Sequence, residues 1–96
     1  MTAYVGNPHD CPVWEEISDE AAAAERKFGR QVDLDEIEWF AVLAEEFGEV
    51  AMDITKRNVP PVGADAPGPL ALRREVVQVA AVCARWLEVM DRRSGR

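Results

Sequence analysis

Apolar residues recur at steps of three and four along three segments of this chain, and no segment shows the alternation typical of a β-strand. This spacing places the apolar side chains on one side of an α-helix. Helices are predicted at about residues 12–28, 33–57 and 69–91. The fold class is therefore predicted to be all-α, a helical bundle of three main helices that forms one domain over residues 1–96.

Local signals set the predicted helix boundaries. Pro12 suits the first position of a helix, and Gly29 is the kind of residue that ends one. Asp33 followed by Glu36 indicates a capping box at the start of the second helix. Four prolines and two glycines in residues 58–69 exclude regular structure there. A loop this long in a compact domain is either functional or mobile.

The apolar surface of the predicted helices exceeds what three helices need to cover one another. A chain of 96 residues builds only a thin core of its own. The wide apolar arcs are accompanied by four large aromatic residues, which are Trp39, Phe40, Phe47 and Trp86. We therefore expect association into a homodimer or homotetramer to complete the core.

The overall charge narrows the possible partners. The chain has 18 acidic and 11 basic residues, a formal net charge of −7. Binding of duplex nucleic acid or of an anionic membrane surface needs a surplus of Lys and Arg, so neither partner is expected. The sequence has no apolar stretch long enough to span a membrane, no signal-peptide pattern and no disulfide framework. A cytoplasmic location is expected.

The negative charge is concentrated on the second predicted helix. Residues 31–55 contain eight acidic residues and no Lys or Arg, whereas the rest of the chain has ten acidic and eleven basic residues. Glu45, Glu49 and Asp53 follow one another at steps of four, so their charges repel on a helix. A solvated face is the simpler explanation. Such faces usually mix both signs of charge, however, and a bound cation would relieve the repulsion.

Glu75 projects into the apolar side of the third helix, and Gln78 lies at the edge of that side. The apolar stripe comprises Leu72, Val76, Val79, Cys83, Trp86, Leu87 and Met90, and Arg85 projects to the opposite side. A carboxylate on a core-facing stripe is unfavourable unless it is paired or coordinates a metal. Both explanations stay open. A salt bridge would use an arginine such as Arg26, Arg74 or Arg85.

Together, Glu45, Glu46, Glu49 and Glu75 can converge on a hard cation from two helices. Mg²⁺ prefers oxygen ligands and keeps several waters, which leaves room for substrate phosphates, and Mn²⁺ is a possible substitute. The sequence shows no competing constellation of His, Cys or Ser and no glycine-rich phosphate loop. It shows no nucleophile–base pair for covalent catalysis.

These segments resemble the MazG-like, all-α nucleoside triphosphate pyrophosphohydrolases. LAEEFGEV (residues 43–50) is similar to their EExxE motif, and LRREVVQVAAVCARWLE (72–88) is similar to the helix that carries their ExxD motif. Twenty-five residues separate Glu49 from Glu75, within the spacing that the family allows. ERKFGRQ (25–31) and Trp39 are more weakly similar to small family members of actinobacteria and their phages. The resemblance covers roughly residues 20–90.

The resemblance implies Mg²⁺- or Mn²⁺-dependent hydrolysis of (deoxy)nucleoside triphosphates to the monophosphate and pyrophosphate. This activity belongs to nucleotide-pool housekeeping, and helical subunits that form dimers or tetramers carry it out. The implied metal ligands are Glu46, Glu49, Glu75 and Gln78. Glu45 and Glu46 are the implied catalytic residues, with Glu45 binding metal or activating the attacking water. The residues expected to contact substrate are Lys27, Arg30, Trp39 and Asp53.

One departure from the family pattern keeps two other functions open. Gln78 stands where the ExxD motif has Asp, which removes a formal charge from the site. The chain is then either an enzyme or a degenerate family member that binds nucleotide or metal without turnover. A third possibility is an interaction module, a helical dimer whose acidic face docks a basic partner while Glu75 forms a salt bridge.

Overall fold

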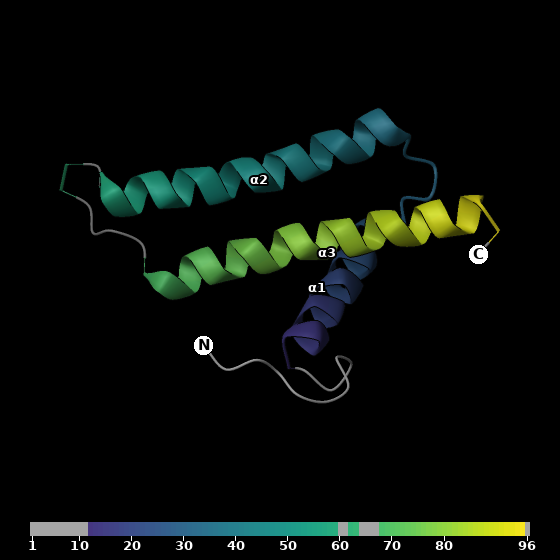
Figure 1. The fold of residues 1–96 in the computed structure, drawn as a ribbon, viewed down its shortest axis with the longest axis horizontal. Coiled ribbons are helices and arrows are strands. Elements are labelled where there is room, and N and C mark those ends of the chain that lie inside the picture. The colour runs from purple at the N-terminus through teal and green to yellow at the C-terminus, as the bar shows by residue number, and fades with distance from the viewer. Residues whose placement is uncertain (1–11, 60–61, 64–67, 96) are drawn as a thin grey trace.

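The computed structural model describes residues 12–59, 62–63 and 68–95, and every regular element within these ranges is an α-helix. Figure 1 shows three helices, with α1 at Pro12–Phe28, α2 at Glu36–Asn58 and α3 at Pro69–Arg93. The prediction of an all-α chain with three main helices is confirmed. The predicted range 12–28 matches α1, and the ranges 33–57 and 69–91 differ from α2 and α3 at their ends.

α1 ends at the predicted position because Gly29 reverses the backbone. Gly29 has a φ of 76°, in the left-handed region that glycine adopts without steric penalty. Its N–H donates a hydrogen bond to the carbonyl oxygen of Glu25 at 2.8 Å, as in a common helix C-cap. Gln31 follows with a φ of 57°, which is uncommon for a residue that carries a side chain.

The capping box of α2 is formed by Asp35 and Glu38, so its predicted location at Asp33 and Glu36 is wrong. Asp35 Oδ1 accepts a hydrogen bond from the backbone N–H of Glu38 at 2.8 Å. Glu38 Oε1 in turn accepts one from the backbone N–H of Asp35 at 3.2 Å. Two backbone donors at the helix start are thereby satisfied.

A contact from α3 accounts for this difference. Asp33–Glu36 and Asp35–Glu38 have the same spacing, so local sequence alone favours neither pair. Arg93 donates hydrogen bonds to the backbone carbonyl oxygens of Val32, at 2.7 Å, and Leu34. These bonds hold the segment before Asp35 as a turn against the end of α3, and the helix begins after it.

α3 is the central helix of the fold. It packs against both α1 and α2, whereas α1 and α2 do not contact each other within the described parts of the chain. In Figure 1, α2 runs antiparallel beside α3, and α1 crosses α3 at a steep angle. Arg73 of α3 also forms a bidentate ion pair with Glu16 of α1, with N–O distances of 2.6 and 2.7 Å.

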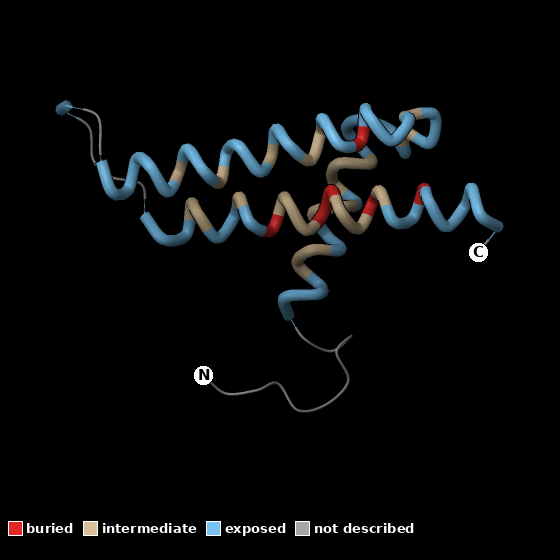
Figure 2. The backbone as a smooth tube through the Cα atoms, turned by 45° about the horizontal axis from the view of Figure 1, so that its top comes forward, coloured by how far each residue is buried: buried red, intermediate tan, exposed pale blue. Residues whose placement is uncertain are grey.

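The core between α2 and α3 is organised by two tryptophans. Trp39 is fully buried, and its ring stacks on that of Trp86 with 6.4 Å between the centroids and 9° between the planes. Val82 and Val89 are buried in the same cluster. Figure 2 shows that the buried positions of the described chain lie along α3 and at one point of α2. This core is small for the apolar content of the chain.

The buried face of α3 differs from the predicted apolar stripe. Val76, Leu87 and Met90 were expected to face the core, yet all three are exposed. The buried residues of α3 are Val77, Ala81, Val82, Arg85 and Val89. Because α3 packs against α2 on one side and α1 on another, its two neighbours select the buried positions. The widest apolar arc of the helix does not determine which of its residues are buried.

Two remaining predictions concern the loop and the membrane. α2 ends at Asn58 and α3 begins at Pro69, which agrees with the predicted break, but residues 60–61 and 64–67 lie outside the described residues. None of the described helices combines the length and apolar character needed to cross a bilayer.

Candidate functional site

Three of the four predicted carboxylates come together between α2 and α3. Glu46 and Glu49 lie about one turn apart on α2, and Glu75 approaches them from the first half of α3. One carboxylate oxygen from each of these residues lies within 4.8 Å of the others. Glu46 and Glu75 are half-buried, whereas Glu49 is exposed. We call these three residues the carboxylate cluster.

The buried oxygens of this region have no hydrogen-bond partner. Glu46 Oε2 and Glu75 Oε2 are both shielded from solvent and unpartnered, as is Oδ2 of the nearby Asp53. A buried carboxylate oxygen without a donor is unfavourable. Mg²⁺ and Mn²⁺ bind carboxylate oxygens together with water, so this donor set suits a divalent cation.

The electrostatics of the cluster point in the same direction. Burial raises the pKa of Glu46, and the neighbouring carboxylates of Glu49 and Glu45 raise it further. Burial is also the largest cause of the raised pKa of Glu75. The contact with Glu49 and the negative charges of Glu46 and Asp53 raise this pKa further. No basic side chain contributes to either shift. A cation would replace this repulsion with attraction.

The salt-bridge explanation for Glu75 is not supported. Arg26, Arg74 and Arg85 were the candidate partners, and none of them forms an ion pair with Glu75 in the described chain.

The acidic side of α2 is also not a simple solvated face. Glu46 and Asp53 are half-buried and belong with Glu75 of α3, whereas Phe40 and Phe47 are 63% and 65% exposed.

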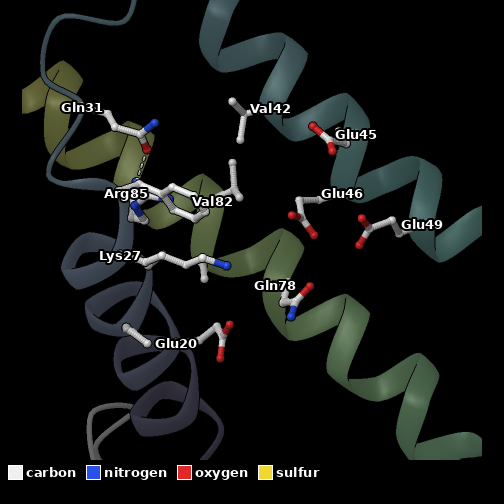
Figure 3. Close-up of a pocket in the computed structure, with 14 residues that line it drawn as sticks. Glu20, Lys27, Gln31, Val42, Glu45, Glu46, Glu49, Gln78, Val82 and Arg85 are labelled. Atoms are coloured by element: carbon white, nitrogen blue, oxygen red, sulfur yellow. Dashed lines mark hydrogen bonds between the residues drawn. The ribbon is translucent and has the colours of Figure 1, made fainter.

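A cavity of about 560 Å³ lies between the three helices, and Glu46 and Glu49 of the carboxylate cluster line it, whereas Glu75 does not. Figure 3 shows Glu45, Glu46 and Glu49 of α2 on one side, facing Gln78 of α3. Gln31 and Arg85 lie at the other end, and Lys27 and Glu20 line the cavity from α1, with Lys27 extending toward its middle. The carboxylates of α2 and the buried guanidinium of Arg85 therefore line the same cavity at separate places.

The four residues predicted to contact substrate differ in their position relative to the cavity. Lys27 lines the cavity. Asp53 lies beside the carboxylate cluster and acts on Glu75 electrostatically, without lining the cavity. Arg30 is exposed and outside the lining. Trp39 is in the core, so its ring is not available to a ligand on this chain.

Sequence reasoning missed three polar residues that line the cavity. Glu20 lines it from α1 and contributes to the raised pKa of Glu46. Arg85 and Gln31 line its far end, and Arg85 Nη2 donates a hydrogen bond to Gln31 Oε1. A signal for Arg85 was present, because it is the single charged residue in VVQVAAVCARWL (76–87). For Glu20 and Gln31 no comparable signal exists in the chain.

Comparison of the chain with models of known protein families, with curated proteins and with solved structures gave no match.

Proposed function

We propose that this protein is a Mg²⁺-dependent hydrolase that converts (deoxy)nucleoside triphosphates to the monophosphate and pyrophosphate, in the manner of the MazG-like family. The observation that carries the proposal is the meeting of Glu46, Glu49 and Glu75 from two helices. Their oxygens lie within 4.8 Å of one another, and no basic side chain offsets their charge. A cytoplasmic role in nucleotide-pool housekeeping follows from this proposal.

In this proposal Glu46, Glu49 and Glu75 would hold the cation, and Gln78 of the same cavity would offer its amide oxygen as a further ligand. The bound cation, Mg²⁺ or Mn²⁺, supplies neutralisation of the triphosphate charge. Glu45 lines the cavity next to the cluster and is exposed, so its carboxylate is available to accept a proton from the attacking water. Attack at the α-phosphorus breaks its bond to the bridging oxygen and releases pyrophosphate.

The test is pyrophosphate release from each (d)NTP with Mg²⁺. Wild-type protein should release pyrophosphate from at least one substrate, and Glu49→Gln should reduce kcat by about two orders of magnitude, the effect typical of removing one key electrostatic group. Glu88→Gln is the matched control, because Glu88 is exposed on α3 away from this cavity. Release that Glu49→Gln leaves unchanged, or no release at all, would contradict the proposal.

A second candidate is a protein that binds nucleotide and metal without turnover. Gln78 favours it, because this cavity residue offers a neutral amide where the family motif has a carboxylate. If this candidate holds, calorimetry will show Mg²⁺–nucleotide binding without hydrolysis, and Gln78→Asp will confer pyrophosphate release. If wild type already turns over substrate, Gln78→Asp will only tighten Mg²⁺ binding.

We also propose that the protein associates as a homodimer or homotetramer through α2. Ile37, Phe40, Phe47 and Ile54 repeat at helical spacing, and all four are exposed. They lie on α2 away from Trp39, the residue that packs on α3. Packing of this surface on its copy across a twofold axis would bury apolar residues that α1 and α3 leave uncovered.

A further inference from the structure

Arg85 carries a buried positive charge that nothing in the described chain neutralises. Its side chain is 4% exposed, and its Nε has no hydrogen-bond partner. The guanidinium lies 5.4 Å from the ring centroid of Trp39 and donates one hydrogen bond to Gln31. No carboxylate of the described residues forms an ion pair with it. A buried charge is unfavourable without a compensating partner, so a ligand anion is the natural complement.

Arg85 lies at the end of the cavity opposite the carboxylate cluster. Gln78 and Arg85 both line the cavity from α3, and the step of seven residues from one to the other corresponds to about 10.5 Å along the helix axis. In Figure 3, Gln31 lies beside Arg85, and Lys27 extends from α1 toward the middle of the cavity. The two ends are joined by a wall that includes Val42 and Val82.

The polar groups nearest Arg85 are donors, whereas the carboxylate of Glu20 lies farther along α1, beyond Lys27. Lys27 offers an ammonium and Arg85 a guanidinium, while Gln31 keeps its amide N–H groups because its oxygen already accepts from Arg85. Their charges do not offset the acidic end, because neither basic residue contributes to the raised pKa of Glu46. Two charged donors and an amide favour an anion over a neutral acceptor.

We propose that Arg85, Lys27 and Gln31 form an anion-binding end of this cavity that holds a phosphate group of the ligand. This inference rests on the proposed function only in that the same ligand would reach the carboxylate cluster with its other phosphates. Arg85 supplies the buried charge and Lys27 an exposed charge at the cavity wall. Gln31 orients the guanidinium.

The experiment measures binding of inorganic pyrophosphate to the full chain by calorimetry in the presence of EDTA. Pyrophosphate should bind wild type without metal, Arg85→Gln should weaken binding at least about tenfold, and Lys27→Gln should weaken it several-fold. Arg85→Lys should bind with intermediate affinity, because it keeps the charge and loses the planar fork. Arg92→Gln is the control for net charge, since Arg92 is exposed on α3 outside the cavity.

Two results would overturn the inference. One is pyrophosphate binding that neither Arg85→Gln nor Lys27→Gln changes. The other is binding of a nucleoside without phosphate that Arg85→Gln abolishes, which would make this end a nucleobase site. Circular dichroism establishes that each variant folds, and the exposed Lys27 decides the matter if Arg85→Gln does not fold.

The same experiment separates this inference from the proposed function. Glu49→Gln should reduce kcat for hydrolysis by about two orders of magnitude, yet bind pyrophosphate in EDTA as tightly as wild type or more tightly, because it removes a nearby negative charge. If hydrolysis is absent but Arg85→Gln still weakens pyrophosphate binding, the anion site stands without the enzyme. If hydrolysis is present and pyrophosphate binding ignores Arg85, the enzyme stands without this site.

Discussion

Glu46 and Glu75 face each other across two helices with raised pKa values, and no side chain among the described residues neutralises them. Each charge was visible in the sequence, and Glu75 was singled out because a carboxylate on an apolar stripe needs a partner. The identity of that partner depends on distances between helices. The structure brings Glu75 to Glu46 and Glu49 and not to an arginine. At the scale of residues, the sequence indicated which carboxylates need a partner, but it did not indicate which side chains lie near them.

The raised pKa values predict a pH dependence of stability. A carboxyl group whose folded-state pKa is raised binds its proton more tightly in the folded than in the unfolded protein. The stability that Glu46 and Glu75 contribute is therefore complete below the unfolded pKa, about 4.3 for Glu, and is lost as pH rises through the folded pKa. In EDTA, the free energy of unfolding contributed by these groups should be lower at pH 7.5 than at pH 5.

Mg²⁺ should reverse this loss, because protons compete with the cation for the same oxygens. A thermal-melt series with Mg²⁺ or EDTA at pH 5, 6 and 7.5 measures the effect. Stabilisation by Mg²⁺ should grow with pH and reach about 2.7 kcal/mol at a concentration of 100 times Kd. Glu75→Gln should remove most of it. An equal Mg²⁺ effect at all three pH values would contradict a cation held by these carboxylates.

At the scale of elements, the start of α2 shows how a tertiary contact selects between two local signals. Asp33–Glu36 and Asp35–Glu38 have the same capping pattern, and both precede the same apolar run. Arg93 stabilises a turn that includes Asp33. Its partners are backbone carbonyls 59 and 61 residues away in sequence, so no local pattern could reveal the choice.

This assignment predicts different effects for two similar substitutions. Asp35→Ala removes the side chain that accepts from Glu38, and we expect it to lower the free energy of unfolding by about 1 kcal/mol. Asp33→Ala is the matched control and should stay within about 0.5 kcal/mol of wild type. Urea denaturation followed by circular dichroism measures both. If Asp33→Ala lowers the free energy of unfolding more than Asp35→Ala does, the cap is Asp33, as the sequence analysis predicted.

At the scale of the whole molecule, a small core and a large exposed apolar surface belong together. The buried hydrophobic residues of the described chain are Trp39, Val77, Ala81, Val82 and Val89. The apolar surface of α2 around Phe40 and Phe47 remains uncovered. Exposed apolar surfaces of this kind are typical of sites where proteins associate, and a stable interface buries about 800 Å² on each partner.

Association through α2 predicts that one charge on that surface will dissociate the protein. Phe47→Glu should shift the mass measured by light scattering to that of a monomer of 10.7 kDa. It should also lower thermal stability, because no partner subunit then covers the apolar surface of α2. Leu70→Glu is the control, since Leu70 is 74% exposed at the start of α3 and away from the α2 surface. A wild-type protein that is monomeric at high concentration would contradict the proposal.

By itself the sequence determined the number of helices in the described chain, the bounds of α1 with the glycine that ends it, and the break between α2 and α3. It also singled out Glu46, Glu49 and Glu75, because helix formation and charge repulsion depend on residues three and four positions apart. Only the tertiary structure decided which side of α3 is buried and which residue caps α2. It also decided that Arg85 lies at the far end of the cavity. These outcomes depend on contacts between helices distant in sequence, and helical periodicity carries no information about which neighbour each face will meet.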